Sequence, residues 1–173
     1  GVRAEREPFP RPTFRFGAVG ERMVREPLAG LSHRSCAEAS MAGLDESTKI
    51  PTEIRLHQKS RILEISFEDG ERFELSYEFL RVFTPSAEAR GHGPGQEVLQ
   101  VGKRDVGIDR VEAVGNYAIR PVFTDGHDSG LYSWDLLYDL GVNRDRLWQA
   151  YLKRLEQAHA SRDPADLQTV AAR

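Results

Sequence analysis

Short segments with alternating apolar and polar residues give the clearest structural signal in the chain. Segments 53–57, 61–67 and 72–75 place apolar residues at every second position, which is typical of strands with one buried face. Asp69 and Gly70 separate the second and third segments, and an Asp-Gly pair is a strong hairpin signal. We therefore expect a three-stranded antiparallel meander.

A short helix is expected directly after this meander. Ser76 can cap a helix over residues 77–82, because its hydroxyl can accept a hydrogen bond from the first helical turn. Phe79, Leu80 and Phe83 would then form one apolar stripe. The helix should lie with this stripe against the sheet.

Further alternating segments predict a second group of strands. They cover residues 97–101, 106–114 and 117–123, and a Gly-Asn pair at 115–116 predicts a tight turn between the last two. Pro121 cannot donate to a strand ladder, so it is expected at a sheet edge or at a bulge.

The densest set of signals follows this hairpin. An Asp-Gly pair at 125–126 predicts a turn, and residues 131–134 have the apolar and aromatic composition of a half-buried strand. Ser133 or Asp135 can then cap an amphipathic helix. We expect His127 to be held at a turn beside the sheet.

Two helices are expected to end the domain. Gly141 should stop the first helix, and Asn143 should cap the second, over residues 144–158. From His159 onward the chain is polar, and we expect it to fray. One apolar stripe on the last helix comprises Leu147, Trp148, Tyr151, Leu152 and Leu155.

Together these elements predict an α+β domain. It should contain an antiparallel sheet of about six or seven short strands, with a short helix after the first meander and two C-terminal helices packed on one side. The predicted domain covers residues 51–158, between a disordered leader, 1–50, and a frayed tail, 159–173.

The leader differs in composition from the rest of the chain. Residues 1–40 hold seven arginines and no lysine, and frequent Pro and Gly interrupt every helical or strand period. An ordinary start could lie at Met41, so we expect residues 1–40 to be an upstream extension outside the working protein. An Arg-rich transit peptide is the minor alternative, because five Glu and several Pro argue against it.

Composition excludes several classes of function. The net charge of -3 over 173 residues provides no basic face for nucleic acid. The single cysteine, Cys36, allows no disulfide and no thiolate zinc cage within one chain. No apolar run approaches the ~20 residues that cross a bilayer. We expect a cytoplasmic protein with no membrane or nucleic-acid partner.

Two places could carry chemistry. The Gly-rich loop 84–96 holds Arg90 and His92, but it lacks the Lys-Ser/Thr ending of a P-loop. A surface loop is therefore the preferred interpretation over a phosphate cradle. The turn at His127 could provide a metal ligand or a general base, although a hydrogen-bonded turn residue is the more common case. Asp125 and Asp128 could join the two histidines around a metal.

No complete catalytic set is apparent. Cys36 lies in the leader, and no serine stands in a nucleophile elbow. Tyr132 and Trp134 could stack on a ligand, but aromatic residues at a strand-to-helix junction more often belong to the core. An enzymatic function is therefore not supported.

Several motifs in the same order resemble the gamma-butyrobetaine hydroxylase-like N-terminal domain family. They read R-I-L-E-I-S-F-E-D-G, L-S-Y-E-F-L-R-V-F-T-P-S, V-G-N-Y-A-I-R-P-V-F-T-D-G-H and G-L-Y-S-W-D-L-L, between residues 61 and 137. The resemblance implies a small standalone bacterial protein of uncharacterised role. In this family the domain is also fused to iron- and 2-oxoglutarate-dependent oxygenases of carnitine synthesis and to P-loop iron-sulfur carriers.

In the oxygenases that this domain resembles, it carries a structural zinc held by three cysteines and one histidine. The resemblance therefore implies where a zinc site would lie in this chain. By motif, the cysteine positions fall on Thr84, Ser86 and Ala89, and the histidine falls on His127. Hydroxyls are poor zinc ligands and Ala is none. We therefore expect neither zinc nor iron, and the catalytic oxygenase domain has no counterpart here.

Two hypotheses remain. The first is a non-catalytic binding or accessory module for a protein partner, which the resemblance links to iron-sulfur or oxygenase metabolism. The second is a metal-binding protein that uses His127, His92 and nearby carboxylates. The oligomeric state is not indicated. The expected binding surface comprises Arg81, Ser86, Arg90, His92, Asp125, His127, Tyr132 and Trp134.

Overall fold

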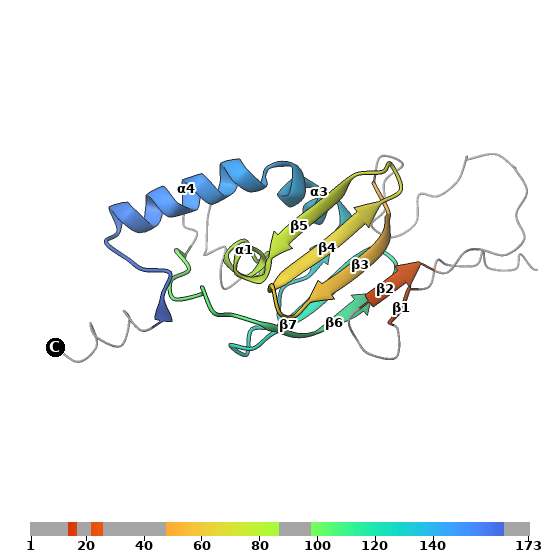
Figure 1. Cartoon of the computed structure of the whole chain (residues 1–173), viewed down its shortest axis with the longest axis horizontal. Coiled ribbons are helices and arrows are strands. Elements are labelled where there is room, and N and C mark those ends of the chain that lie inside the picture. Colours follow the sequence, from red (N-terminus) through yellow and green to blue (C-terminus); the bar gives the residue numbers. More distant parts are fainter. Residues whose placement is uncertain (1–13, 17–21, 26–47, 87–97, 165–173) are drawn as a thin grey trace, which may run out of the picture.

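The computed structural model describes residues 14–16, 22–25, 48–86 and 98–164 (Figure 1). The first strands are β1 (Phe14–Phe16), β2 (Arg22–Arg25), β3 (Pro51–His57), β4 (Ile62–Phe67) and β5 (Arg72–Ser76). Helix α1 (Tyr77–Val82) follows, and then β6 (Ile108–Val114), β7 (Ala118–Phe123), β8 (Tyr132–Ser133), α3 (Trp134–Val142) and α4 (Arg144–Gln157).

The first five strands form one antiparallel sheet in the order β1-β2-β3-β4-β5. The predicted meander corresponds to β3, β4 and β5. At its second turn, Gly70 has a φ of +89°, and the backbone N–H of Glu71 donates to Asp69 Oδ1 at 3.1 Å. The Asp-Gly signal therefore predicted both the place of this turn and its cause.

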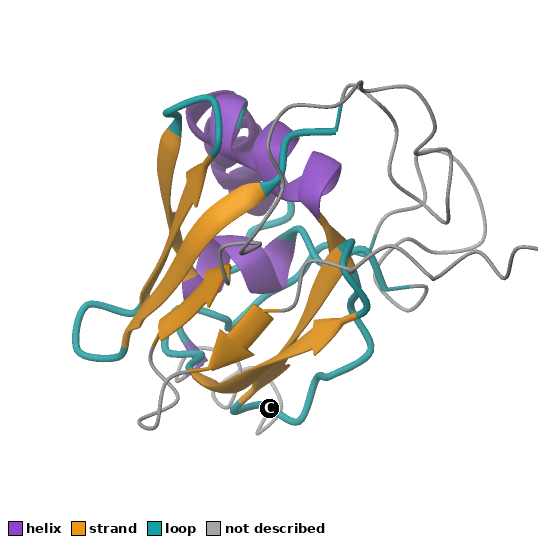
Figure 2. Cartoon of the chain, turned by 90° about the vertical axis from the view of Figure 1, so that its right-hand side faces the viewer, coloured by secondary structure: helices purple, strands orange, loops and turns teal. Residues whose placement is uncertain are grey.

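The other three strands form a separate antiparallel sheet in the order β6-β7-β8. The α+β class is confirmed, but the prediction of a single sheet is wrong. Figure 2 shows the strands as two groups with helical segments beside them. Both sheets contribute apolar residues to the same buried cluster. The alternating pattern of a strand therefore indicates that one face is buried but does not indicate which sheet the strand joins.

The strand predicted over residues 97–101 is absent from its described part, 98–101. Backbone groups there are used by other elements, because the Gln100 carbonyl accepts from Tyr151 Oη at 2.8 Å. The N–H of Gly102 donates to the Ser161 carbonyl at 3.0 Å. A helix side chain and the C-terminal tail therefore replace a strand ladder.

The prediction of a disordered leader is wrong for seven of its residues. Phe14–Phe16 and Arg22–Arg25 form an antiparallel hairpin, and β2 extends the sheet at the edge of β3, with Met23 opposite Ile54. Strands this short have no detectable period, and the pairing depends on backbone groups that the β3 edge offers. The rest of residues 1–47 lies outside the described part of the chain.

The buried core lies between the sheets and the helices. Tyr132 and Trp134 are both fully buried in it. Phe67, Phe73 and Tyr138 pack edge to face, with ring centroids 5.0–5.9 Å apart. The largest fully buried side chains are those of Trp134, Tyr77, Tyr132, Phe79, Phe123, Ile54, Leu63, Ile65, Leu75, Leu80 and Ile108.

The predicted caps of the first two helices are present. Ser76 Oγ accepts from the N–H of Phe79 at 3.2 Å, and Ser133 Oγ accepts from Leu136 at 3.3 Å. Asn143 precedes α4 but makes no side-chain cap, since its Oδ1 accepts from the Arg146 guanidinium at 3.1 and 3.3 Å.

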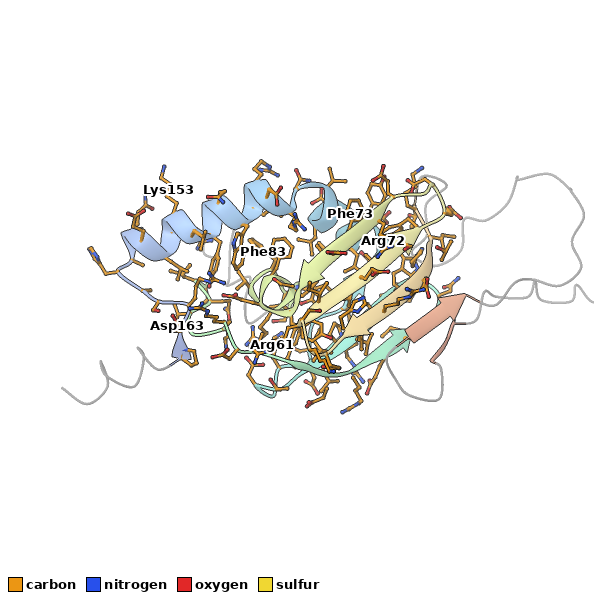
Figure 3. All side chains as sticks on the ribbon, in the orientation of Figure 1. Arg61, Arg72, Phe73, Phe83, Lys153 and Asp163 are labelled. Atoms are coloured by element: carbon orange, nitrogen blue, oxygen red, sulfur yellow. The ribbon has the colours of Figure 1, made fainter. Side chains whose placement is uncertain are left out.

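Gly141 does not stop α3, which continues to Val142. A Cβ on Gly141 would overlap the ring of Phe73 on β5, and Figure 3 shows Phe73 near α3. The glycine is therefore required by close packing of the helix on the sheet, not by helix termination.

Residues 159–163, here called the C-terminal strap, were predicted to fray but are held by contacts with other elements. The Arg162 carbonyl accepts from the N–H of Arg104 at 3.0 Å, and its guanidinium donates to both oxygens of Glu78 at 2.8 and 2.6 Å. The same guanidinium lies 4.9 Å from the ring centroid of Trp148. These contacts tie the strap to α1 and α4.

Within the described part of the chain, no helix combines the length and the apolar character needed to cross a membrane.

Candidate functional site

The turn between β7 and β8 is held by its own backbone. The N–H of Phe123 donates to the His127 carbonyl at 2.9 Å, and the N–H of Gly126 donates to the Phe123 carbonyl at 3.1 Å. Gly126 has a φ of +82°, which favours glycine. Asp125 Oδ1 accepts from the N–H of His127 at 3.3 Å. As predicted, His127 is fixed at a turn beside the sheet.

The His127 side chain points inward. Its ring is 8% exposed, packs 6.0 Å from the ring of Phe123, and has Nε2 only 3.0 Å from Thr84 Oγ1. Gly130 allows this approach, because a Cβ there would overlap the Thr84 hydroxyl. The pair therefore joins the segment after α1 to the turn before β8.

A cluster of charged side chains lies beside this pair. Asp125 Oδ2 accepts from Arg81 Nε at 2.9 Å and from Lys103 Nζ at 2.7 Å, and Arg81 Nη1 donates to Gln100 Oε1 at 3.1 Å. Burial raises the pKa of Asp125, but the hydrogen bond from Lys103 and the charge of Arg81 outweigh it. The resulting pKa is below the usual range, so the carboxylate is charged at neutral pH.

Tyr132 and Trp134 do not contribute to an exposed surface. Tyr132 Oη donates to the Leu80 carbonyl at 2.6 Å, and Trp134 Nε1 donates to the Asn116 carbonyl at 2.7 Å. Burial raises the pKa of Tyr132 far above its usual value. The alternative that both rings belong to the core is therefore the correct one, since a buried Tyr or Trp uses its polar atom internally.

Ser86 is also buried, at 4% exposure. Its Oγ has no hydrogen-bond partner among the described residues. Arg90, His92 and Ala89 lie outside the described residues.

The donors at the positions implied by the resemblance do not fit zinc. Thr84 and Ser86 offer hydroxyls where zinc prefers thiolate or imidazole, and the Thr84 hydroxyl already contacts His127. No group of three or more His, Cys, Asp or Glu side chains among the described residues is arranged to hold a metal. His127 is instead a member of a buried hydrogen-bonded pair.

The same pair resembles a nucleophile and its base, because a hydroxyl lies within hydrogen-bond reach of an imidazole. Catalysis also requires space for a reacting group next to the nucleophile. Thr84 is only 4% exposed, and Gly130 packs directly against its hydroxyl. The arrangement is suited to holding the turn in place.

Sequence reasoning did not identify Lys103 or Gln100 as part of this region. Both lie in the irregular segment 98–104, which carries no motif. Their contacts with Asp125 and Arg81 span 22 and 19 positions, and no local pattern reports them. Arg81 was predicted as part of the binding surface. It is 8% exposed and contacts Asp125 as a buried side chain.

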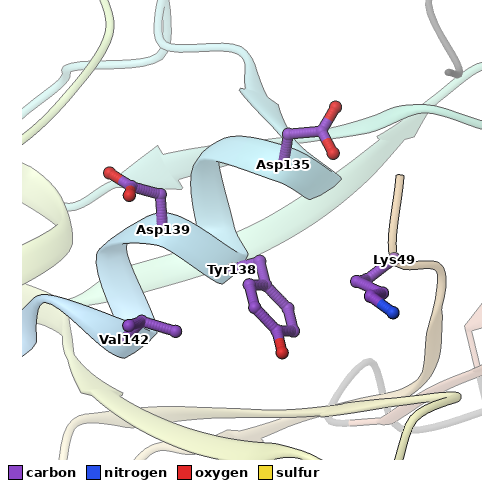
Figure 4. A pocket seen from close by; sticks show the side chains of 5 residues that line it. All are labelled: Lys49, Asp135, Tyr138, Asp139 and Val142. Carbon is purple, nitrogen blue, oxygen red and sulfur yellow. The ribbon is translucent and has the colours of Figure 1, made fainter. Parts of the chain in front are cut away.

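A pocket of about 290 Å³ lies elsewhere, on α3 (Figure 4). It is lined by Lys49, Asp135, Tyr138, Asp139 and Val142. None of the predicted site residues lines it. Asp135 accepts from Thr48 at 3.0 Å, and Asp139 accepts from Asn143 at 2.8 Å, so both carboxylates have neutral hydrogen-bond donors.

Three solved structures are similar to this chain. Two are NMR solution structures with TM-scores of 0.61: one is 47% identical and aligns over 68% of this chain and 93% of its own, the other 51% over 72% and 92%. The third is a crystal structure of a protein of unknown function from Acidithiobacillus ferrooxidans, of the DUF971 family. It is 35% identical over 53% of this chain and 91% of its own, with a TM-score of 0.45.

Comparison with curated proteins gives no match. The family model described as gamma-butyrobetaine hydroxylase-like, N-terminal, matches residues 54–138. This region begins in β3 and ends in α3, and it includes Thr84, Ser86 and His127. The chain therefore belongs to the gamma-butyrobetaine hydroxylase-like N-terminal domain family.

Proposed function

We propose that this chain is a non-catalytic accessory module that binds a protein partner through the turn 124–131. The observation that carries the proposal is that the imidazole, hydroxyl and charged side chains below the turn contact one another. Thr84 contacts His127, and Arg81 and Lys103 contact Asp125. These contacts fix the turn, and a fixed turn loses little conformational entropy on binding.

The outer side of the turn offers a mixed surface. Asp128 and Ser129 are exposed, and Leu131 is an exposed large apolar residue at 46%. Polar groups around an apolar side chain are typical of the rim and centre of a protein interface. Asp125 contacts Arg81 and Lys103 below the turn. The exposed side chains on the outer side of the turn are those of Asp128, Ser129 and Leu131.

Family membership suggests the class of partner. The domain is shared with iron- and 2-oxoglutarate-dependent oxygenases and iron-sulfur carriers, so we propose a partner from iron or iron-sulfur metabolism. This step is an analogy at the level of the family.

A comparative affinity purification tests the proposal. The full chain, an Asp128→Arg/Leu131→Glu variant and a matched Lys153→Glu control are each used as bait in lysate of the native host. Lys153 is exposed on α4 and points away from the sheets (Figure 3). We expect the wild type and the control to retain a protein of iron or iron-sulfur metabolism. The turn variant should not retain it. Purified candidate and chain must then bind directly.

No reproducibly enriched protein, or equal retention by the turn variant, would contradict the proposal. The alternative of a metal-binding protein using His127, His92 and nearby carboxylates has its own test. Metal analysis of protein purified without a histidine tag should find less than one zinc or iron per chain. A stoichiometric metal that His127→Ala removes would favour the alternative.

A further inference from the structure

The inference concerns β6, one of the two edge strands of the three-stranded sheet. One of its edges pairs with β7. No described strand pairs with its other edge, and Figure 1 shows β6 in the lower part of the molecule. An edge of this kind presents backbone donors and acceptors that can pair with another strand. Gln58 Nε2 donates to the Ile108 carbonyl at 3.0 Å, so the backbone at this end of β6 already has a partner. Residues 109–114 form the remaining part of the edge.

The register with β7 indicates where the backbone of β6 points. Val111 lies directly opposite Pro121, and proline has no N–H to donate. This fits a non-hydrogen-bonded pair, in which the N–H and C=O of Val111 are directed to the open edge. Pro121 is tolerated within the middle strand because β8 pairs only with Ala118 and Ile119 and does not reach it.

The outward side chains along this edge alternate in charge. Arg110 Nε donates to Glu112 Oε1 at 2.8 Å, and Arg120 of β7 donates to Glu112 Oε2. The Arg110 side chain is 63% exposed. The edge therefore presents one positive and one negative side chain on the same face, two positions apart and centred on Val111.

We propose that two copies of this chain pair through β6, antiparallel, about a two-fold axis at Val111. In this register Arg110 lies opposite Glu112 of the partner subunit, and the symmetry repeats the contact. The stripe from Arg120 through Glu112 then continues to Arg110 of the partner subunit. Opposite charges placed across from each other stabilise a strand pair, and the same patch on both copies makes a closed interface.

The charges also select the register. A shift by two residues in one direction places Arg110 opposite Arg110 of the partner subunit. The shift in the other direction places Glu112 opposite Glu112 of the partner subunit. Like charges directly opposite each other are destabilising, so both shifted registers are disfavoured. The axis at Val111 pairs residues 109–113 of one copy with the same residues of the other in reverse order. This surface differs from the turn 124–131 and goes beyond the proposed function.

Light scattering coupled to size exclusion tests the proposal on the full chain at increasing concentration. We expect the mass to rise from 19.5 kDa to twice that value. Arg110→Glu and Glu112→Arg should each remain monomeric, because each places like charges across the axis. Lys153→Glu makes the same charge change on α4 as Arg110→Glu and should dimerise like the wild type.

Mixing the two monomeric variants gives the decisive measurement. A copy with Glu at 110 and 112 faces a copy with Arg at both positions, so a heterodimer should form where neither variant dimerises alone. A loss of folding in the single variants cannot produce this result, and circular dichroism melts check their fold separately. A wild-type chain that stays monomeric, single variants that still dimerise, or a mixture that stays monomeric would overturn the proposal.

Discussion

Thr84 and His127 form the hydrogen bond that joins the segment after α1 to the turn before β8. Both side chains are buried, at 4% and 8% exposure. Thr84→Val keeps the shape of the side chain but removes the hydroxyl next to Nε2. We expect the free energy of unfolding to fall by about 1–3 kcal/mol, measured by urea denaturation.

The matched control is Thr52→Val on β3, where the same atom donates to the Ser66 carbonyl at the surface. That change should alter the free energy of unfolding by less than about 0.5 kcal/mol. Equal effects at the two sites would show that the buried pair does not hold the turn. Thr84→Ser should retain most of the stability, because it keeps the hydroxyl.

Tyr151 gives the chain a pH dependence in alkaline solution. Burial, followed by the charge of Glu78, raises its pKa to about 12, although Arg162 acts in the opposite direction. Its hydroxyl donates to the Gln100 carbonyl at 2.8 Å and must remain protonated to do so. The unfolded chain ionises near pH 10, so stability is fully present below pH ~10 and is lost as pH rises toward ~12.

Tyr151→Phe isolates this contribution from the other tyrosines. The free energy of unfolding of the wild type should fall by about 2–3 kcal/mol more than that of the variant between pH ~10 and ~12. Guanidinium titrations at several pH values measure both curves. Parallel curves for the two proteins would contradict the raised pKa.

At the scale of elements, Gly141 shows how closely α3 packs on β5. Ala is the better helix former by about 1 kcal/mol, but its Cβ would overlap the ring of Phe73. That ring also packs on Phe67 and Tyr138 and cannot easily move. We expect Gly141→Ala to lower the free energy of unfolding by about 1–2 kcal/mol, as measured in urea.

The same substitution in a Phe73→Ala background provides the control. With the ring removed, the added methyl group has space, and Gly141→Ala should become neutral or stabilising through helix propensity. A double-mutant cycle gives the coupling between the two positions. An unchanged effect in both backgrounds would mean that Gly141 matters for another reason.

Local signals predicted the elements well. A cap or a tight turn depends on residues within about three positions, so Ser76, Ser133 and Asp69 revealed their elements. Partners far apart in sequence left no such signal. Arg162 and Glu78 are 84 positions apart, and the contact of Thr84 with His127 spans 43. The turn was therefore predictable, while the strap and the charged cluster below the turn were not.

For the whole molecule, the position of the core determines which parts of the chain are needed to fold. The members of the buried cluster run from Ile54 to Leu140, and α4 adds Tyr151 and Leu155. In the described part of the leader, β1 and β2 extend the first sheet at the edge of β3. A chain that begins at Met41 should therefore unfold in one cooperative transition, followed by tryptophan fluorescence and circular dichroism in urea.

A chain that ends at Gln157 should behave differently, because it lacks the strap. Glu78 is 6% exposed and would lose both hydrogen bonds from Arg162. A hydrogen bond to a charged group contributes about 1.5–3 kcal/mol, so this deletion should lower the free energy of unfolding by at least that amount. Arg162→Ala in the full chain should reproduce most of the loss. A leader deletion that abolishes cooperative unfolding would show that the leader is needed to form the core. A strap deletion without effect would show that the hydrogen bonds between Arg162 and Glu78 do not stabilise the fold.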